Sequence, residues 1–392
     1  MERENKNQGL EILRAVAVIA VLYSHFLGQK SFGSWGAHKP NYSFGYGVDL
    51  FLCISGYVVS LSLLRSFKTR DWTHETGVTK SKFLLAFMTR RFFRLAPSAY
   101  LWASIMLLYS ACLPSYERFL PPSYLIKEIY GVVLYIYNIF VHFDILLRSD
   151  TPKYLGYYWT LSLEWQFYLA VVLMFLYCRF ATRIFCLIVI LTSFAVFPNT
   201  KMFVWFRLDA LLWGCLIAHL LQRFLGHIAI WTETKGFALN LLKIIVGNAL
   251  FAYAFHLLLV ARYDSPRYLL PLLGCFSAIS ILLAACGLKP GIAPLTDRLF
   301  LWIGERSYSI YLIHLPVFYW INETYFRMLE NSVITENNMD YLGPIFASLA
   351  ILLIWGLSHL NFRFIEQPLR KIGISLAAKI LPLQREPETH CN

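Results

Sequence analysis

Charged residues are scarce in this chain. Only 15% of its 392 residues are Asp, Glu, Lys or Arg, whereas 58% are hydrophobic. About a quarter of the residues in a soluble protein are charged, so this composition excludes a soluble globular fold. The sequence therefore predicts an integral membrane protein.

Acidic residues are the scarcer of the two signs. The chain has 23 Asp and Glu against 35 Lys and Arg, a formal net charge of +12. The basic excess stands mainly in short loops between apolar segments, as in 65–94, where the positive-inside tendency of membrane proteins explains it. No nucleic-acid partner is therefore expected.

Metal and disulfide motifs are also lacking. The 8 cysteines fall mostly inside apolar runs, with no Cys-x-x-Cys and no histidine at metal-ligand spacing. Neither a disulfide framework nor a metal site is predicted. A cleavable signal peptide is not expected, because MERENKNQ is polar and no small-x-small site follows. With no internal repeat or soluble appended domain, we expect one transmembrane domain, 1–372, and a short cytoplasmic tail, 373–392.

The apolar runs that could cross or enter a membrane lie at 10–28, 44–64, 95–113, 125–147, 158–178, 184–197, 203–222, 241–260, 268–288, 299–321 and 342–362. An odd number of crossings from a cytoplasmic N-terminus would place the basic C-terminal residues outside. Segment 114–157 contains prolines and is interrupted by Glu128, His142 and Asp144, so we expect a partly embedded excursion on the outer side. The sequence thus predicts an all-α, polytopic membrane protein with about ten transmembrane helices and both termini in the cytoplasm.

An ionisable pair stands inside the first apolar run. Arg14 and His25 are 11 residues apart in LEILRAVAVIAVLYSHF, which on a helix sets them about 20° apart in direction and about 16 Å apart along the axis. A charge that faced lipid would cost a few kcal/mol, so both are expected to face a protein interior or a wet pocket. The pair indicates a functional cavity, with a structural polar network as the alternative.

Other isolated polar residues fall near the outer ends of the predicted spans: Asp49, Glu164, Arg207, Asp209 and His314. A histidine beside a carboxylate suits general-base catalysis, because the carboxylate fixes the imidazole tautomer and stabilises the imidazolium. Both Asp49 and Glu164 also suit ion pairs with Arg14 or Arg207 that only neutralise buried charge. His314 taken alone also suits a hydrogen-bonded structural histidine.

A basic cluster marks the inner side. The segment TRRFFRLAP presents Arg90, Arg91 and Arg94 where the loop enters the third span. Arginines three or four residues apart share a helix face and bind phosphate bidentately. We expect them to hold an anionic phosphorylated donor whose reactive end reaches the buried histidine. The alternative is that they are ordinary topology signals.

Short motifs follow one another along the chain in a fixed order: LEILRAVAVIAVLYSH, GYGVDLFLCISGY, RRFFRLAP, WTLSLEWQFY, RLDALLWG, SYSIYLIHLP and EQPLRK. With them the chain, from about residue 9 to 372, resembles the acyltransferase-3 family of membrane acyltransferases. That family includes bacterial O-antigen and exopolysaccharide O-acetyltransferases and macrolide acyltransferases. Thr160 stands where many members have Ser, and Ala15 where many have Gly. The esterase-like extension of some members is not expected, because only about 20 residues follow the last motif, so any second transfer step is expected to use another protein or not to exist.

The resemblance implies a reaction. It is the transfer of an acyl group, expected to be acetyl, from cytoplasmic acyl-CoA to a hydroxyl of a cell-surface or secreted glycan or a lipid-linked glycan. The location it implies is the bacterial inner membrane. A small-molecule acceptor such as a macrolide is the alternative.

The resemblance also implies roles for individual residues. Arg90, Arg91 and Arg94 would bind the CoA phosphates, and Arg14 would position the donor or polarise its carbonyl. His25 would be the general base, with Asp49 or Glu164 as its orienting carboxylate. A covalent acyl-histidine is the other mechanism. Substrate contacts are expected from Trp159, Arg207, Tyr308 and His314.

Two other classes of protein fit part of the pattern. A transporter or flippase also carries intramembrane charge, but it predicts inverted repeats with paired broken helices, which the sequence lacks. A non-catalytic assembly or signalling subunit predicts tolerance of His25 replacement.

Overall fold

The computed structural model describes residues 7–37, 47–68, 75–112, 122–146, 154–196, 207–233, 269–285, 294–335 and 339–382. Within these ranges the chain is helical and has no β-strand. The predicted apolar run 241–260 lies outside them, as do residues 114–121 and 147–153 of the predicted excursion 114–157. The all-α prediction is confirmed.

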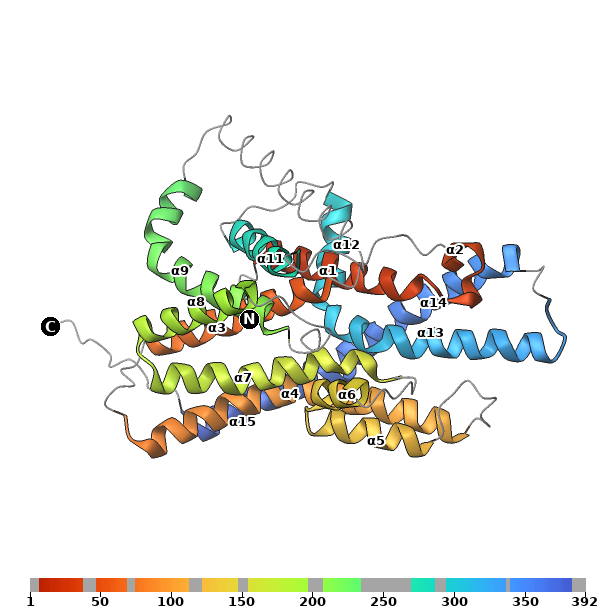
Figure 1. Ribbon diagram of the computed structural model, residues 1–392, viewed down its shortest axis with the longest axis horizontal. Coiled ribbons are helices and arrows are strands. Elements are labelled where there is room, and N and C mark those ends of the chain that lie inside the picture. Colours follow the sequence, from red (N-terminus) through yellow and green to blue (C-terminus); the bar gives the residue numbers. More distant parts are fainter. Residues whose placement is uncertain are drawn as a thin grey trace.

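The helices occur in the order α1 (Gln8–Phe26), η1 (Lys30–Phe32), α2 (Ser34–Ala37), α3 (Gly47–Lys68), α4 (Gly77–Cys112), α5 (Pro122–Val133), α6 (Tyr137–Leu146), η3 (Gly156–Tyr158), α7 (Trp159–Tyr177), α8 (Phe180–Val196), α9 (Leu208–Glu233), α11 (Leu269–Ala285), α12 (Pro294–Glu305), α13 (Ser307–Glu330), α14 (Met339–Asn361), η6 (Phe362–Glu366) and α15 (Gln367–Ile380). Most of the long helices run roughly along the long axis of the molecule (Figure 1).

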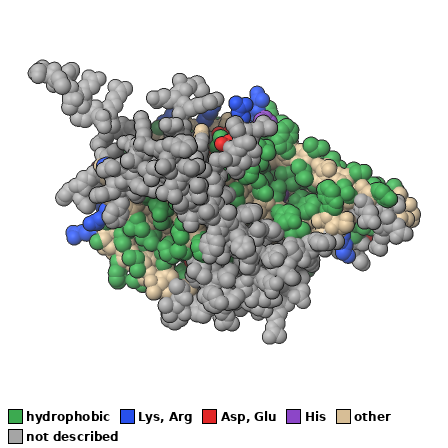
Figure 2. All heavy atoms as spheres, turned by 90° about the horizontal axis from the view of Figure 1, so that it is seen from above, with side chains coloured by type: hydrophobic (Ala, Val, Ile, Leu, Met, Phe, Trp, Pro, Cys, Tyr) green, Lys and Arg blue, Asp and Glu red, His purple; other side chains and the backbone are tan. Residues whose placement is uncertain are grey.

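Several of these helices are suited to a bilayer. The described residues contain 5 segments long and apolar enough to cross it, at 8–26, 47–68, 77–112, 156–177 and 341–380, and shorter apolar helices at 180–194 and 273–285. On the face shown in Figure 2, apolar side chains predominate among the described residues. An apolar outer surface over such helices is typical of a protein surrounded by lipid. The chain is a polytopic membrane protein, as predicted.

Helix α1 carries both Arg14 and His25 without a break. It begins after Asn7, whose side-chain oxygen accepts the Leu10 N–H at 3.2 Å, a standard N-terminal cap. The Asn7 amide also donates to the Ala284 carbonyl in α11 at 2.9 Å, which ties the start of α1 to that helix. The predicted axial separation of Arg14 and His25, about 16 Å, therefore applies.

The predicted run 125–147 divides into α5 and α6, of 12 and 10 residues. Neither can span about 30 Å of hydrocarbon alone. The break contains Tyr135, in the left-handed region at φ 54°, and the Gln166 side chain donates to its carbonyl at 2.9 Å. Buried Glu128 accepts from Tyr137 Oη at 2.9 Å and from the Leu155 N–H at 2.7 Å. Polar residues that interrupt the apolar run thus fix its fold.

Two helices extend beyond their predicted spans. Helix α4 has 36 residues, about 54 Å, so the segment with Arg90, Arg91 and Arg94 is helical and continuous with the span. Helix α14 continues through the π-helical turn η6 into α15, which packs along α4 (Figure 1). The predicted boundary at residue 372 therefore falls inside α15.

Helices α3 and α9 approach so closely that only glycine fits at the crossing. A Cβ at Gly56 would overlap the Leu211 carbonyl, and a Cβ at Gly214 would overlap the Cys53 carbonyl. Small residues at a crossing let two membrane helices bring their backbones together. This contact fixes the position of α3, which carries Phe51 and Ser55 toward the cavity described next.

Candidate active site

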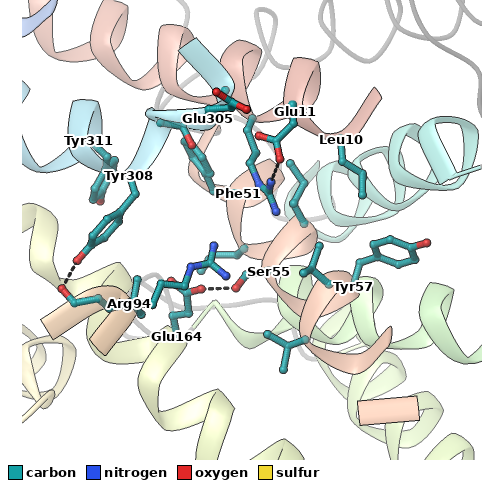
Figure 3. Close-up of a pocket in the computed structure, with 18 of the residues that line it drawn as sticks. Leu10, Glu11, Phe51, Ser55, Tyr57, Arg94, Glu164, Glu305, Tyr308 and Tyr311 are labelled. Atoms are coloured by element: carbon teal, nitrogen blue, oxygen red, sulfur yellow. Dashed lines mark hydrogen bonds and ion pairs between the residues drawn. The ribbon is translucent and has the colours of Figure 1, made fainter. Parts of the chain in front are cut away.

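A cavity of about 690 Å³ opens between α1, α3, α4, α7, α9, α11, α12, α13 and the η6–α15 segment. Figure 3 labels some of the lining side chains, which come from α1, α3, α4, α7, α12 and α13. A pocket of this size holds a medium-sized organic molecule. Because segments from residue 7 to residue 370 build it, the cavity depends on the whole fold.

Four guanidinium groups line the cavity, from Arg14, Arg65, Arg94 and Arg370. Arg65 and Arg370 are exposed, whereas Arg14 and Arg94 are of intermediate exposure. Carboxylates also line it, from Glu11, Glu164, Glu305 and Glu366. The cavity thus has cationic groups both at its solvent-exposed end and deeper inside, a distribution that suits a long ligand with several anionic groups.

The two deeper arginines differ in their partners. Arg14 Nη1 lies 2.5 Å from Glu11 Oε1, one turn away on α1, so its ion pair is with Glu11 rather than with Asp49 or Glu164. Arg94 makes no hydrogen bond or ion pair within the described part of the chain, although its charge interacts with Glu164, Glu366 and Glu11. Arg94 is therefore the deeper cation that is available to a ligand.

Glu164 lies in this cavity beside Arg94 (Figure 3). Its carboxylate accepts hydrogen bonds from Ser55 Oγ and Tyr168 Oη. The Tyr168 ring is in turn covered by the Arg91 guanidinium, 5.1 Å from its centroid. Glu164 is thus held by two hydroxyl donors, and it has no contact with His25 among the described interactions.

Tyr311 closes one side of the cavity. Its hydroxyl lies 2.8 Å from Thr160 Oγ1 and donates to the Tyr157 carbonyl at 2.8 Å. The same ring packs against His314, one turn further along α13, with centroids 5.7 Å apart. Tyr308 also lines the cavity and donates to the Leu95 carbonyl at 2.6 Å. Tyr311 therefore stands between the cavity and the histidines behind it.

His25 and His314 form a pair. His314 Nε2 lies 3.1 Å from His25 Nδ1, and His25 Nδ1 also lies 3.0 Å from the Val21 carbonyl. His314 is fully buried and His25 is partly exposed. Neither residue is among those that line the cavity. The structure thus gives His25 a histidine partner in the place where the sequence predicted a carboxylate.

Asp49 belongs to a separate buried cluster. Arg207 Nη2 lies 2.9 Å from Asp49 Oδ1, and Arg207 Nε lies 3.3 Å from Asp209 Oδ1. The three side chains are 5% exposed or less, so two carboxylates enclose one guanidinium. This is the charge-neutralising arrangement that the sequence left open for Asp49, and it places Arg207 away from the cavity lining.

The remaining predicted residues lie around the cavity rather than in it. Arg91 packs over Phe87 and Tyr168, and neither it nor Arg90 is part of the lining. Trp159, at the start of α7, packs against two groups of buried apolar side chains, one that includes Leu163 and one that includes Leu161. No group of three His, Cys, Asp or Glu in the described ranges is placed to hold a metal ion.

Sequence reasoning missed Arg65 and Arg370 as lining residues. Each is among the first basic residues after a predicted span, so the sequence alone suggests only a topology signal. The available clue was the helical spacing of Glu366 and Arg370, which places both on one face of the helix that continues α14. Tyr311 was part of a recognised motif, but its place as the cavity wall needed the structure.

The chain is similar to known proteins over most of its length. Residues 7–359 match the model of the acyltransferase-3 family, described as an acyltransferase domain. The chain is 26% identical over 399 residues to the O-acetyltransferase OatA of Staphylococcus aureus, in strains NCTC 8325, COL and MRSA252 alike. The match covers 94% of this chain and 58% of OatA, so the chain spans less than two thirds of these relatives. No solved structure matches.

Proposed function

Because this chain belongs to the acyltransferase-3 family of membrane proteins, we propose that it is a membrane O-acetyltransferase. It would move an acetyl group from cytoplasmic acetyl-CoA to a hydroxyl of a cell-surface or secreted glycan, or of its lipid-linked precursor. We place it in the bacterial inner membrane with both termini in the cytoplasm, as the positive-inside tendency predicts. The name of its relatives supports the reaction type, and the acceptor class is our inference.

The observation that carries the proposal is the cavity with arginines along its length and a histidine pair behind its wall. Exposed Arg65 and Arg370 would bind the CoA phosphates at the open end, together with Arg94 further in. Arg14 would position the thioester end of the donor. Guanidinium groups recognise phosphate by paired, charge-assisted hydrogen bonds. Arg90 and Arg91 lie outside the cavity lining and would contribute only to the positive electrostatic potential around the donor.

His25 would then act on the acceptor. Its imidazole takes the proton of the acceptor hydroxyl while that oxygen attacks the thioester carbonyl. The carbon–sulfur bond breaks, the CoA thiolate leaves, and the imidazolium returns the proton to the sulfur. The covalent alternative uses the same ring as nucleophile, with the acyl group resting on it between two transfers. In both mechanisms one nitrogen of His25 must be unprotonated and accessible.

Tyr311 and Thr160 would set the boundary between donor and acceptor. Their hydrogen bond, 2.8 Å long, closes the cavity on the side of the histidines. The acetyl end of the donor would reach His25 past this wall. Acetyl is the acyl group proposed because the relatives are named O-acetyltransferases.

The proposal is tested on the host's surface glycan. Ester-linked acetyl is measured after mild alkaline release, in hosts that express the intact chain or His25→Ala at equal membrane level. The expected result is loss of glycan acetyl with His25→Ala. A second variant, His142→Ala, changes a histidine of α6 with no assigned role and should leave the acetyl content unchanged. Equal acetyl in all three hosts would reject a glycan acceptor.

A further inference from the structure

The hydrogen-bond contacts of His25 and His314 determine which nitrogen of each ring carries the proton. His314 Nδ1 lies 2.7 Å from the Tyr311 carbonyl. A carbonyl oxygen only accepts, so His314 Nδ1 carries the proton in the neutral ring, and its Nε2 is left with a lone pair. That lone pair is directed at His25, 3.1 Å away.

The same reasoning then fixes the tautomer of His25. Its Nδ1 faces two acceptors, the Val21 carbonyl at 3.0 Å and His314 Nε2 at 3.1 Å. If His25 Nδ1 had no proton, its lone pair would face the lone pairs of the Val21 carbonyl and of His314 Nε2, with no hydrogen among the three atoms. Nδ1 must therefore be the protonated nitrogen. His25 Nε2 has no hydrogen-bond partner among the described residues, and the ring is partly exposed.

We propose that His314 is a positioning residue that holds His25 with Nδ1 protonated and Nε2 free for the acceptor hydroxyl. The role rests on the proposed function, and it applies to both mechanisms, because Nε2 would also be the nucleophile in an acyl-histidine. When His25 takes a proton, the new positive charge is shared with two acceptors already in place. His314 thus does what a carboxylate does in other histidine bases.

The setting of His314 supports this role. The ring is fully buried and packs against Tyr157, Tyr311 and Phe318, with centroids 6.0, 5.7 and 6.0 Å away. Such packing on several sides holds the ring in one orientation. A fixed second ring is what a positioning residue requires, and a substrate-binding residue would need more exposure.

The test compares two amide substitutions that differ in reach. His314→Gln places an amide oxygen near the position of Nε2, where it can accept from His25. His314→Asn carries the same amide nearer to the backbone, by the Tyr311 carbonyl, and does not reach His25. Transfer of labelled acetyl from acetyl-CoA to alkali-labile ester is measured in membrane vesicles. We expect His314→Gln to keep most of kcat and His314→Asn to lose about 10- to 100-fold, with the KM for acetyl-CoA unchanged in both.

A double variant separates positioning from folding. If His314 acts through His25, then His25→Ala combined with His314→Asn should have the same residual rate as His25→Ala alone. Equal kcat for wild type and His314→Asn would overturn the proposal. So would a larger loss with His314→Gln than with His314→Asn, since a structural role does not depend on reaching His25.

A spectroscopic measurement keeps the proposal independent of activity. The protein is labelled with ¹⁵N-histidine and its ¹⁵N NMR spectrum is recorded in lipid vesicles. The signals of His25 are identified by their loss in His25→Gln. They should show a protonated Nδ1 and an unprotonated Nε2. A protonated Nε2 with a bare Nδ1 would contradict the inference. If vesicles of the wild type transfer no acetyl at all, the proposed function fails, and the tautomer of His25 is still decided by this spectrum.

Discussion

At the residue scale, His25 is paired with His314, whose Nε2 lies 3.1 Å from His25 Nδ1. Depth along a helix follows from residue number, which is why Asp49 and Glu164 were placed near His25. The direction in which a side chain points within the helix bundle does not follow from residue number, because it depends on how each helix is rotated about its axis. Asp49 meets Arg207 at 2.9 Å, and Glu164 meets Ser55. The histidine pair was within the predicted set, but nothing in the sequence joined its two members.

Arg94 provides the first prediction at this scale. Arg94→Gln removes a cavity charge that has no ion-pair partner in the described ranges, so donor affinity should fall while folding is retained. We expect the KM for acetyl-CoA to rise about 10-fold or more, with kcat changed less. Arg90→Gln is the matched control, one turn away on α4 and outside the cavity lining. Equal effects in the two variants would contradict the assignment of the cavity to the donor.

Asp49 gives a prediction about stability. Asp49→Asn removes one of the carboxylates that neutralise the buried Arg207 guanidinium and should lower the free energy of unfolding by about 3 kcal/mol. The measurement is the apparent melting temperature of the protein in detergent. Glu305→Gln is the control, because its pair with Arg306 is partly exposed and 3.6 Å long, which should contribute less than about 1 kcal/mol. A larger loss in the control would show that burial does not govern the two pairs.

At the scale of elements, the apolar runs predicted where helices lie better than where they end. The α4 helix begins well before its apolar run because its N-terminal part packs along α15. Hydropathy does not detect a charged helix that packs on another helix. The π-helical turn η6 likewise continues α14 past the end of the predicted apolar run 342–362. The split of the run 299–321 at Arg306 into α12 and α13 was also missed. Hydropathy alone does not mark such a break, although this turn places Glu305, Ser307 and Tyr308 in the cavity wall.

The contact between α3 and α9 supplies a prediction at this scale. Gly214→Ala adds a methyl group that would overlap the Cys53 carbonyl, so the two helices must separate. Because α3 also carries cavity residues, we expect less folded protein in the membrane and a lower melting temperature. Gly356→Ala, in α14, is the control, since nothing lies within 4 Å of its added Cβ. Equal stability of the two variants would show that the close approach is not needed.

At the scale of the whole molecule, composition and the run pattern predicted the class of protein, an all-α polytopic chain. The arrangement of four arginines along one cavity could not be predicted, because these residues come from helices far apart in sequence. They are Arg14, Arg65, Arg94 and Arg370. The predicted membrane topology, with both termini in the cytoplasm, has a direct consequence. The C-terminal end of α4 should lie on the outer side of the membrane, and the turn between α7 and α8 on the cytoplasmic side. Cys112 and Cys178 stand at these two places, exposed and partly exposed.

Those two cysteines test the threading. In intact cells, a membrane-impermeant maleimide should label a single-cysteine chain that keeps Cys112. A chain that keeps only Cys178 should be labelled after the membrane is opened. The reverse pattern would place Arg65 and Arg370 on the outside and would remove the cytoplasmic route for the donor.

The central claim is transfer of an acetyl group from acetyl-CoA that depends on His25. The most direct test supplies labelled acetyl-CoA to the cytoplasmic face of host membrane vesicles that contain the wild-type chain or His25→Ala in equal amount. The label that mild alkali releases as acetate is then counted. The account predicts alkali-labile label in wild-type vesicles and background in the variant; equal label in the two, or none in either, would contradict it.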